Sequence, residues 1–361
     1  MRSVTVPTKT PYEVRIEPAL DLEEAVTSAL PPGTAAIVAD SNVGPLYAGS
    51  VLGALEGAGW MVADAMTVPA GEGSKSLSVY EGVVRRLAGA RLPRAATLFS
   101  LGGGVVGDLG GFVASSYARG IGFVQLPTSL LAMVDSSVGG KVGLDLPEGK
   151  NLIGAFLQPR LVAADLDWLD SLPPREVSNG LAEVIKMGLL SGGRFFADLK
   201  RCLAQAHSGD KEALLALILH SVRAKAAVVA RDEKEAGLRA TLNYGHTVGH
   251  GLEAAADYDL PHGEAVAAGL LVAARLGRER FGADLVELHE DLLQAAGLPL
   301  KVPAAKVEPV LAAMGRDKKR RTLDRAGEYR FVLLEDVGRP RWDILVDADE
   351  VCRVLGEVLA L

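Results

Sequence analysis

The chain has 361 residues, 49% hydrophobic and 23% charged, a composition typical of globular proteins and not of disordered or fibrous ones. At about 150 residues per domain, this length predicts two domains. Two cysteines are too few for a disulfide framework or a cysteine-rich zinc site. The net charge of −7 argues against general affinity for nucleic acid, so we expect a small anionic substrate instead.

Apolar runs along the chain are short. The longest we find, residues 265–274, falls well below the ~18 residues that span a bilayer. The first residues show no apolar segment typical of a signal peptide. We therefore expect a soluble cytoplasmic protein with neither nucleic acid nor a membrane among its partners.

The first half of the chain alternates short apolar runs with amphipathic ones. We predict strands at residues 35–39, 61–68 and 95–101, with helices between them at 43–57 and 77–91. Strands that alternate with helices form parallel sheets. The sequence therefore predicts an α/β domain over residues 1–165.

The second half has a different composition. Pro173 and Pro174 interrupt any continuing element, and long stretches rich in alanine and leucine follow, such as residues 211–231. We place the domain boundary at about residue 165 and predict a mainly helical domain over 166–361. Near its end we expect one strand, at residues 330–335, and a terminal helix.

A glycine cluster, GGGVVGDLGG at 102–111, stands where a strand ends and a helix begins. Glycines there let backbone N–H groups approach a pyrophosphate at the positive end of the helix. The cluster matches G-x-G-x-x-G. However, Pro127 and Thr128 stand about twenty positions later, where a dinucleotide site usually has an acidic residue. A tight packing turn between strand and helix is the alternative.

Three more segments of the first half carry polar side chains beside glycines. GEGSK (71–75) holds Glu72 and Lys75, and taken singly it is typical of a surface turn. PTSLLAMVDSSVGGK (127–141) is not a P-loop, because Asp135 replaces the glycine that such a loop requires. GKNLIG (149–154) offers Lys150 and Asn151, which can contact an anion and hydroxyls. A polar helix cap and an ordinary turn are the alternatives for the last two.

The second half contains candidate residues for a metal site. Glu183 and Lys186 are three positions apart, hence on one side of a helix; an exposed ion pair is the alternative. His246, His250 and His262 lie within 17 residues. Spacing alone favours His246 and His250 as an i, i+4 pair of Zn²⁺ ligands completed by a third group.

The remaining histidines and one basic segment do not indicate a particular function. We interpret His207, His220 and His289 as ordinary helix histidines. The basic run 316–321 (RDKKRR) is either a solvated face or a contact for a phosphate or carboxylate.

Taken together and in this order, the motifs resemble those of 3-dehydroquinate synthases, in the sugar-phosphate cyclase superfamily. The resemblance spans about residues 35–340 and rests on GEGSK, GGGVVGD, PTSLLAMVDSSVGGK, GKNLIGAF, AEVIK, LNYGHTVGH, HGEAV and DKK. It implies an N-terminal Rossmann-like NAD-binding α/β domain, a mainly α-helical C-terminal metal-binding domain, and catalysis in the cleft between them. We also expect a homodimer.

The resemblance also implies a reaction. Such a phosphorus–oxygen lyase of the shikimate pathway converts 3-deoxy-D-arabino-heptulosonate 7-phosphate to 3-dehydroquinate and phosphate. The implied steps are transient oxidation by NAD, elimination of phosphate, reduction, ring opening and intramolecular aldol closure. The cofactor is regenerated in each turnover.

By the same resemblance, particular residues take particular roles. The metal ligands, for Zn²⁺ or Co²⁺, become Glu183, His246 and His262, which replaces the helical pair and leaves His250 on the substrate side. The implied NAD-binding residues are Asp40, Glu72, Lys75, Gly103, Gly104, Val105, Asp108, Thr128, Ser129, Asp135, Lys141, Lys150 and Ser171. The implied catalytic and substrate-binding residues are Arg119, Asp135, Lys141, Lys150, Asn151, Lys186, Lys225, Arg239, Asn243, His250 and either Lys318 or Lys319.

The sequence departs from the family pattern at two positions, and three other functions are alternatives. Ser129 and Ser171 stand where the family commonly has threonine. The rivals are another sugar-phosphate cyclase (an aminodehydroquinate or valiolone-type synthase), a metal-dependent polyol dehydrogenase, and a noncatalytic NAD sensor. The last would have eroded metal ligands and lysines, which are intact here. The residues that favour dehydroquinate over the other cyclases are Lys141, Asn151, Arg239, His250 and Gly269.

Overall fold

The computed structural model describes residues 2–256, 259–302, 307–315 and 327–360. The chain forms two compact units, one of Met1–Leu172 with Lys225–Lys234, the other of Pro173–Ala224 with Glu235–Leu361. The first unit thus extends beyond the predicted boundary at residue 165 and takes in a later segment. A boundary drawn at one point of the sequence cannot represent a chain that returns to its first unit.

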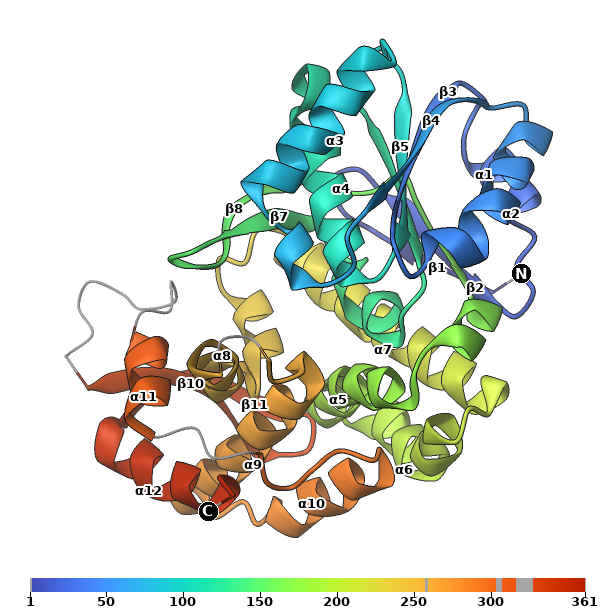
Figure 1. The fold of residues 1–361 in the computed structure, drawn as a ribbon. Coiled ribbons are helices and arrows are strands. Elements are labelled where there is room, and N and C mark those ends of the chain that lie inside the picture. Colours follow the sequence, from blue (N-terminus) through green and yellow to red (C-terminus); the bar gives the residue numbers. More distant parts are fainter. Residues whose placement is uncertain (1, 257–258, 303–306, 316–326, 361) are drawn as a thin grey trace. The chain divides into compact units, whose positions relative to one another are not determined.

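A seven-stranded sheet forms the centre of the first unit (Figure 1). Its order is β1-β2-β9-β6-β5-β3-β4, and every neighbouring pair is parallel except β1 with β2. The strands are β1 (Ser3–Val6), β2 (Tyr12–Glu17), β3 (Thr34–Asp40), β4 (Met61–Val68), β5 (Thr97–Gly102), β6 (Gly122–Pro127) and β9 (Leu161–Asp165). The three predicted strands are therefore present as β3, β4 and β5.

Helices cover both faces of this sheet. On one face, Val26 of α1 (Leu22–Ala29) and Leu55 of α2 (Gly44–Gly57) pack in a core with Phe99 of β5. A second core holds α3 (Leu77–Gly89) and α4 (Gly104–Ser116) against the opposite face. Figure 1 shows the sheet between these two pairs of helices. Because β3 and β5 are covered on both sides, they are continuous apolar runs rather than alternating ones.

A two-stranded hairpin and four short helical turns complete the first unit. The hairpin pairs β7 (Lys141–Leu146) with β8 (Gly149–Phe156). A Cβ at Gly143 would lie 2.5 Å from the carbonyl oxygen of Ile153, so the two strands approach too closely there for a side chain. The turns are η1 (Glu72–Ser74), η2 (Tyr117–Arg119), η3 (Ala132–Ser136, a π-helical turn) and η4 (Leu166–Ser171).

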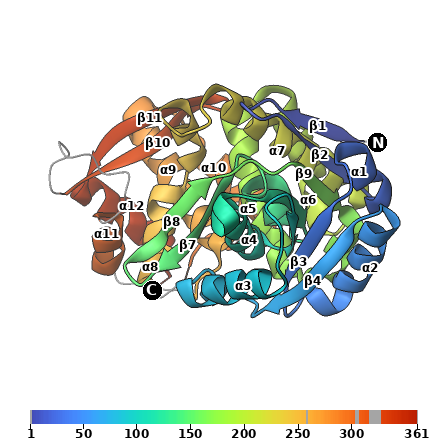
Figure 2. The ribbon, with the colours of Figure 1, turned by 90° about the horizontal axis from the view of Figure 1, so that it is seen from above.

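The second unit is mainly helical, as predicted. One antiparallel hairpin, β10 (Glu328–Asp336) with β11 (Arg339–Asp347), lies beside α9 and is visible in Figure 2. Only the first of these strands was predicted; most side chains of β11 are exposed, so its apolar signal is weak. The helical elements are α5 (Pro174–Ser191), α6 (Gly193–His207), α7 (Lys211–Arg231), η5 (Leu238–Asn243), α8 (His246–Ala255), α9 (His262–Phe281), α10 (Val286–Ala295), α11 (Val307–Gly315) and α12 (Ala348–Val358). The last residues of α7, from Lys225 on, belong to the first unit.

Among the described residues, α7 is the one helix long and apolar enough to cross a membrane by length and composition. The core helix of a soluble protein passes the same test, and 56% of the apolar window of α7 is buried within the fold. Length and composition are therefore weak evidence for a membrane span at this helix.

Candidate active site

The direction of winding reverses between β3 and β5. The chain adds β4 on one side of β3 and then crosses to place β5 on the other side. In open parallel sheets, ligands bind beyond the carboxyl ends of the strands at such a reversal. Asp40 ends β3 and Gly102 ends β5, so the predicted acidic residue and the predicted glycine loop meet at this place.

The acidic group beside the glycine loop comes from the neighbouring strand. Asp40 Oδ1 accepts hydrogen bonds from the backbone N–H groups of Asn42 and Val43, both at 2.9 Å, which fixes the turn into α2. A Cβ at Gly102 would lie 3.1 Å from Asp40 Oδ2. The acidic residue that is missing twenty positions after the loop in the sequence is thus supplied by β3.

The glycine loop leads directly into α4. Gly103 is the residue that caps this helix, and it has no side chain to accept hydrogen bonds from the first turn. A Cβ at Gly103 would lie 3.3 Å from Ser129 Oγ, and one at Gly104 would lie 2.9 Å from Ser136 Oγ. The N-terminus of α4, where Val105 also lies, therefore has the open N–H groups and close hydroxyls of an anion cradle.

The hydroxyl segment that follows β6 closes this cradle. The Thr128 N–H donates to the carbonyl of Gly102 at 3.0 Å, which holds the segment beside the loop. Ser136 Oγ is buried and has no hydrogen-bond partner among the described residues. Ser136 is the last residue of η3 and belongs to the hydroxyl-rich segment 127–141; its place beside the glycine loop was not predicted.

The GEGSK motif is not the surface turn that it resembles when taken singly. Lys75 is only 5% exposed, and its Nζ lies 2.9 Å from Asp108 Oδ2 and 3.5 Å from Glu72 Oε1. It also donates a 2.7 Å hydrogen bond to Asn151 Oδ1. Asp145, which sequence analysis missed, lies 3.8 Å away. Three motifs separated along the chain, GEGSK, GGGVVGD and GKNLIG, therefore converge on one ammonium group.

The charged groups in this cluster shift one another's pKa values. Burial lowers the pKa of Lys75, but the carboxylates of Asp108, Glu72 and Asp145 outweigh it and raise the pKa above its usual value. Burial raises the pKa of Asp108, against the opposing effect of Lys75. Lys75 therefore stays charged and neutralises the carboxylates around it. Lys150 adds a second ammonium 3.5 Å from Glu72.

Buried Lys225 and half-buried Asp135 form another ion pair of the first unit. Lys225 Nζ lies 2.6 Å from both the carbonyl oxygen and the carboxylate Oδ1 of Asp135. Asp135 belongs to the π-helical turn η3, a distortion that is frequent at functional sites. Lys141 is exposed at the start of β7.

Two predicted residues of the first unit stand apart from this cluster. Arg119 follows the C-terminal end of α4, so about 13 residues of helix, roughly 20 Å, separate it from the glycine loop. Ser171 Oγ accepts a 2.8 Å hydrogen bond from the hydroxyl of Tyr47. The described contacts do not bring either residue to the glycine loop.

In the second unit, three side chains form a candidate metal centre. Glu183 of α5, His246 at the start of α8 and His262 at the start of α9 each offer one ligand atom, and these atoms all lie within 4.8 Å of one another. Glu183 Oε1 is 3.3 Å from His246 Nε2 and 3.4 Å from His262 Nε2. His250 lies outside this group, which therefore differs from the helical pair that spacing alone favoured. The three candidate ligands come from three different helices.

Partners of the other ring nitrogens orient both imidazoles. His246 Nδ1 lies 3.1 Å from the carbonyl oxygen of Tyr244, and His262 Nδ1 lies 3.5 Å from Glu253 Oε1. Each ring thereby turns Nε2 towards Glu183. Metal-binding histidines are held in this way, with one nitrogen on a carbonyl or carboxylate and the other free for the metal. Glu253 was missed, although it lies seven residues after His246 on the same helix face.

The residues fit a divalent metal. Glu183 is fully buried, and neither of its carboxylate oxygens has a hydrogen-bond partner of normal geometry among the described residues. Lys186 Nζ is in close ionic contact with Oε2, which leaves Oε1 facing the two imidazoles. One carboxylate and two imidazoles are the ligands of an open zinc-type site. Lys186 is itself buried and not the exposed partner considered above.

Electrostatics favour an ionised carboxylate here. Burial raises the pKa of Glu183, but the charge of Lys186 and the interactions with both imidazoles outweigh it and hold the pKa well below its usual range. Burial, with the nearby Lys186 charge, lowers the pKa of His246 to about 4. Burial lowers the pKa of His262 too, but Glu183 and Glu253 outweigh the effect of burial and raise this pKa to about 10. A bound cation would replace the proton at His262.

Of the other predicted residues of the second unit, His250 lies beside this centre. The His250 ring lies 5.2 Å from that of His246 and 6.5 Å from that of His262, between centroids. Arg239 is buried in η5, and Asn243 Nδ2 donates to Glu235 Oε1 at 3.3 Å. Lys318 and Lys319 lie outside the described residues.

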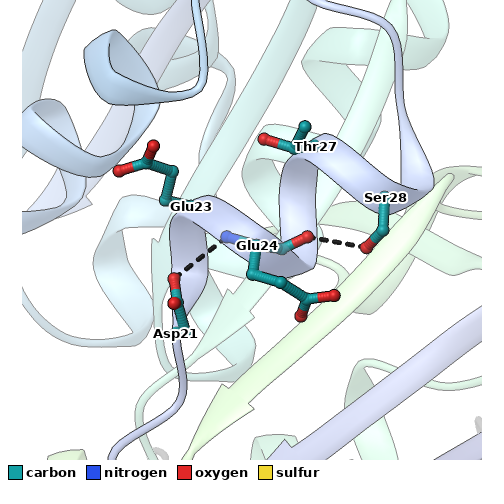
Figure 3. Close-up of a pocket in the computed structure, with 5 residues that line it drawn as sticks. All are labelled: Asp21, Glu23, Glu24, Thr27 and Ser28. Carbon is teal, nitrogen blue, oxygen red and sulfur yellow. Dashed lines mark hydrogen bonds between the residues drawn. The ribbon is translucent and has the colours of Figure 1, made fainter.

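A surface depression of about 320 Å³ occurs elsewhere in the first unit (Figure 3). It lies along α1 and is lined by acidic and hydroxyl side chains, two of which bond to the helix backbone: Asp21 accepts from the N–H of Glu24, and Ser28 donates to the Glu24 carbonyl. None of the predicted site residues lines it. The chemistry described above belongs to the glycine loop and the metal centre.

Comparison with solved structures defines the class of protein. The fold is that of a sugar-phosphate cyclase. One such structure is 2-deoxy-scyllo-inosose synthase complexed with carbaglucose-6-phosphate, NAD⁺ and Co²⁺, with a TM-score of 0.90 and 25% identity over 99% of this chain and 100% of that one. Another is 2-epi-5-epi-valiolone synthase from Streptomyces hygroscopicus subsp. jinggangensis 5008 with NAD⁺ and Zn²⁺, with a TM-score of 0.87 and 27% identity over 96% of each chain.

Sequence comparison then identifies the family. The N-terminal and C-terminal family models of 3-dehydroquinate synthase match residues 65–179 and 180–320. A curated 3-dehydroquinate synthase of Acidithiobacillus ferrooxidans (strain ATCC 53993 / BNL-5-31) is 48% identical over 316 residues, 86% of this chain and 85% of that protein. The chain belongs to the 3-dehydroquinate synthase family, which confirms the resemblance and the two-part fold class inferred from the motifs.

Proposed function

We propose that this chain catalyses the conversion of 3-deoxy-D-arabino-heptulosonate 7-phosphate to 3-dehydroquinate and phosphate, and so is a phosphorus–oxygen lyase. The observation that carries the proposal is the convergence of Glu183, His246 and His262 on one point, in a chain so similar to curated 3-dehydroquinate synthases. We further propose that it works in the cytoplasm as a homodimer.

The proposal assigns the cofactor to the first unit. Asp40 is placed to accept hydrogen bonds from a ribose, and the N-terminus of α4 to bind the pyrophosphate. Lys75 supports this site indirectly, because it holds Asp108, Glu72 and Asn151 in place. The remaining predicted NAD residues join them as part of the same proposal. The two cyclase structures named above contain NAD⁺.

The proposal assigns the metal, Zn²⁺ or Co²⁺, to Glu183, His246 and His262. When bound, NAD supplies a temporary hydride acceptor and the metal a Lewis acid that acidifies a substrate hydroxyl. Lys186 keeps Glu183 Oε2 engaged, so that Oε1 is the ligand atom. His250, on the same helix as His246 but outside the ligand group, is left to act on the substrate.

Binding of the anionic substrate falls to cationic and amide side chains. Lys186 and Arg239 of the second unit are buried, so their charges act with little screening. Asn243 can bind a hydroxyl through its amide. Lys141, Lys150, Asn151 and Lys225 complete the proposed set, with Arg119 and one of Lys318 or Lys319 for the carboxylate or phosphate.

One assay distinguishes this function from its rivals. Purified protein with NAD and Co²⁺ should release phosphate from the heptulosonate phosphate and form 3-dehydroquinate, with no net gain in absorbance from NADH. Stoichiometric NADH with a polyol would instead identify a dehydrogenase. Turnover of a different sugar phosphate, with none of the heptulosonate phosphate, would identify another cyclase.

A further inference from the structure

Two side chains that are not metal ligands, Tyr244 and His289, form a hydrogen bond inside the second unit. Tyr244 Oη lies 2.8 Å from His289 Nε2, and neither residue is exposed to solvent. The rings meet edge to face, with centroids 5.9 Å apart. Tyr244 comes from the turn that precedes α8, and His289 lies on α10. Sequence analysis interpreted His289 as an ordinary helix histidine.

The direction of this hydrogen bond follows from its neighbours. His289 Nδ1 lies 2.6 Å from the carbonyl oxygen of Leu285. A carbonyl only accepts, so Nδ1 carries the hydrogen. Burial lowers the pKa of His289 to about 4, so the ring is neutral and Nε2 is an acceptor. The hydroxyl of Tyr244 therefore donates to His289.

The backbone of the same tyrosine contacts a proposed metal ligand. The carbonyl oxygen of Tyr244 lies 3.1 Å from His246 Nδ1. Because this carbonyl also only accepts, it keeps a hydrogen on Nδ1 and leaves Nε2 bare, as a metal ligand must be. A rotation of the peptide between residues 244 and 245 would remove this acceptor.

Several contacts hold that peptide. Gly245 adopts φ +78°, which favours glycine, and α9 packs closely on it: a Cβ at Gly269 would lie 1.8 Å from the carbonyl oxygen of Gly245. The N–H of Tyr244 donates to the carbonyl of Thr241 at 3.1 Å. The side chain of Tyr244, hydrogen-bonded to His289, fixes this peptide on the Tyr244 side.

We propose that Tyr244 and His289 are positioning residues of the metal centre: they orient the Tyr244 carbonyl so that His246 presents Nε2 towards Glu183. This inference rests on the proposed metal site. It deepens that proposal, because it extends the set that determines metal affinity to a histidine on α10. The alternative is a core hydrogen bond that contributes stability alone.

A double substitution separates these two roles. Tyr244→Phe alone leaves His289 Nε2 buried without a donor, which destabilises the protein. Adding His289→Leu removes that orphaned acceptor, so stability should recover in part. Positioning, however, is lost in both variants. Ser221→Ala is the matched control, since Ser221 is fully buried and donates its own hydrogen bond to the Leu217 carbonyl at 2.9 Å.

The measurement is the Kd for Co²⁺, by competition with a chromogenic chelator, alongside urea unfolding of the metal-free proteins. Loss of an orienting contact typically weakens metal affinity about 10- to 100-fold. We expect Tyr244→Phe and the Tyr244→Phe/His289→Leu pair to raise the Kd about tenfold or more, with an altered visible spectrum of bound Co²⁺. Ser221→Ala should bind within about twofold of the wild type.

Three results would contradict this inference. A double variant that binds Co²⁺ as tightly as the wild type overturns the positioning role. So does a Kd that rises in every variant, Ser221→Ala included, in step with lost stability. A wild-type protein that binds no Co²⁺ overturns the proposed metal centre itself, and this inference with it; tight binding by the wild type keeps the two failures apart.

Discussion

Lys75 donates a 2.7 Å hydrogen bond to Asn151, 76 positions later in the chain. The same ammonium group lies 2.9 Å from Asp108, so one buried cation joins the GEGSK turn, the start of α4 and the β7–β8 hairpin. Its charge balances carboxylates that would otherwise repel one another. This cluster supports the proposed NAD site without belonging to a single motif.

Replacing Lys75 should therefore affect both stability and cofactor binding. Lys75→Met removes the cation that opposes the effect of burial on Asp108, and removal of one partner of a buried ion pair costs about 3 kcal/mol of unfolding free energy. Because Asp108 is partly exposed, this value is an upper estimate. Urea unfolding measures the loss, and calorimetric titration measures the weaker binding of NAD. Lys200→Met, at an exposed position, is the control and should change neither quantity appreciably.

Removal of the metal should abolish activity. The proposed centre has three ligands and no thiolate, so a chelator should strip it, and Zn²⁺ or Co²⁺ should restore phosphate release. His262→Ala should lose metal and activity together, since it removes one of three ligands. Elemental analysis and the phosphate assay check both expectations. Normal turnover by a verified metal-free protein would exclude a role for the metal.

The two histidines of α8 should give different defects. His246→Ala removes a ligand and should sharply lower the bound metal. His250→Ala should keep nearly stoichiometric metal and its fold, yet reduce kcat, because the ligand set survives while a group near the substrate is lost. Metal content measured on both purified variants decides between them. A metal-depleted His250→Ala protein would restore the helical pair that spacing suggested.

The free energy of unfolding should decrease as the pH is lowered, because of His289. Its pKa is about 4 in the folded chain and about 6.5 when unfolded, so between these values the unfolded state binds the extra proton. Stability from this group is complete above pH 6.5 and is lost as the pH falls towards 4, by roughly 3 kcal/mol in total. Urea unfolding at pH 7 and pH 4.5 measures it. The Tyr244→Phe/His289→Leu variant lacks the group, so its stability should fall less; an equal fall would assign the effect to other residues.

Local sequence determined much of the fold. β3 and β5 were predictable because buried parallel strands are short continuous apolar runs, and α3 because an amphipathic helix repeats its apolar side. The weakly apolar strand β11 and the N-terminal strands β1 and β2 were not predicted. Their position in a sheet depends on partners far away in the sequence, such as β9 for β2.

The glycine loop was also predictable from the sequence, because close backbone approach to a phosphate requires glycine at fixed spacing. The order of the motifs indicated the family. The assembly of each site was not. Spacing along one helix paired His246 with His250, whereas packing of α5, α8 and α9 brought Glu183 and His262 to His246. Likewise, the acidic partner of the glycine loop comes from β3 and the buried environment of Lys75 from the β7–β8 hairpin. Sequence fixes which side chains are available and what chemistry they can perform; only tertiary packing decides which of them meet, since ligands and ion pairs join residues across elements where no local periodicity operates.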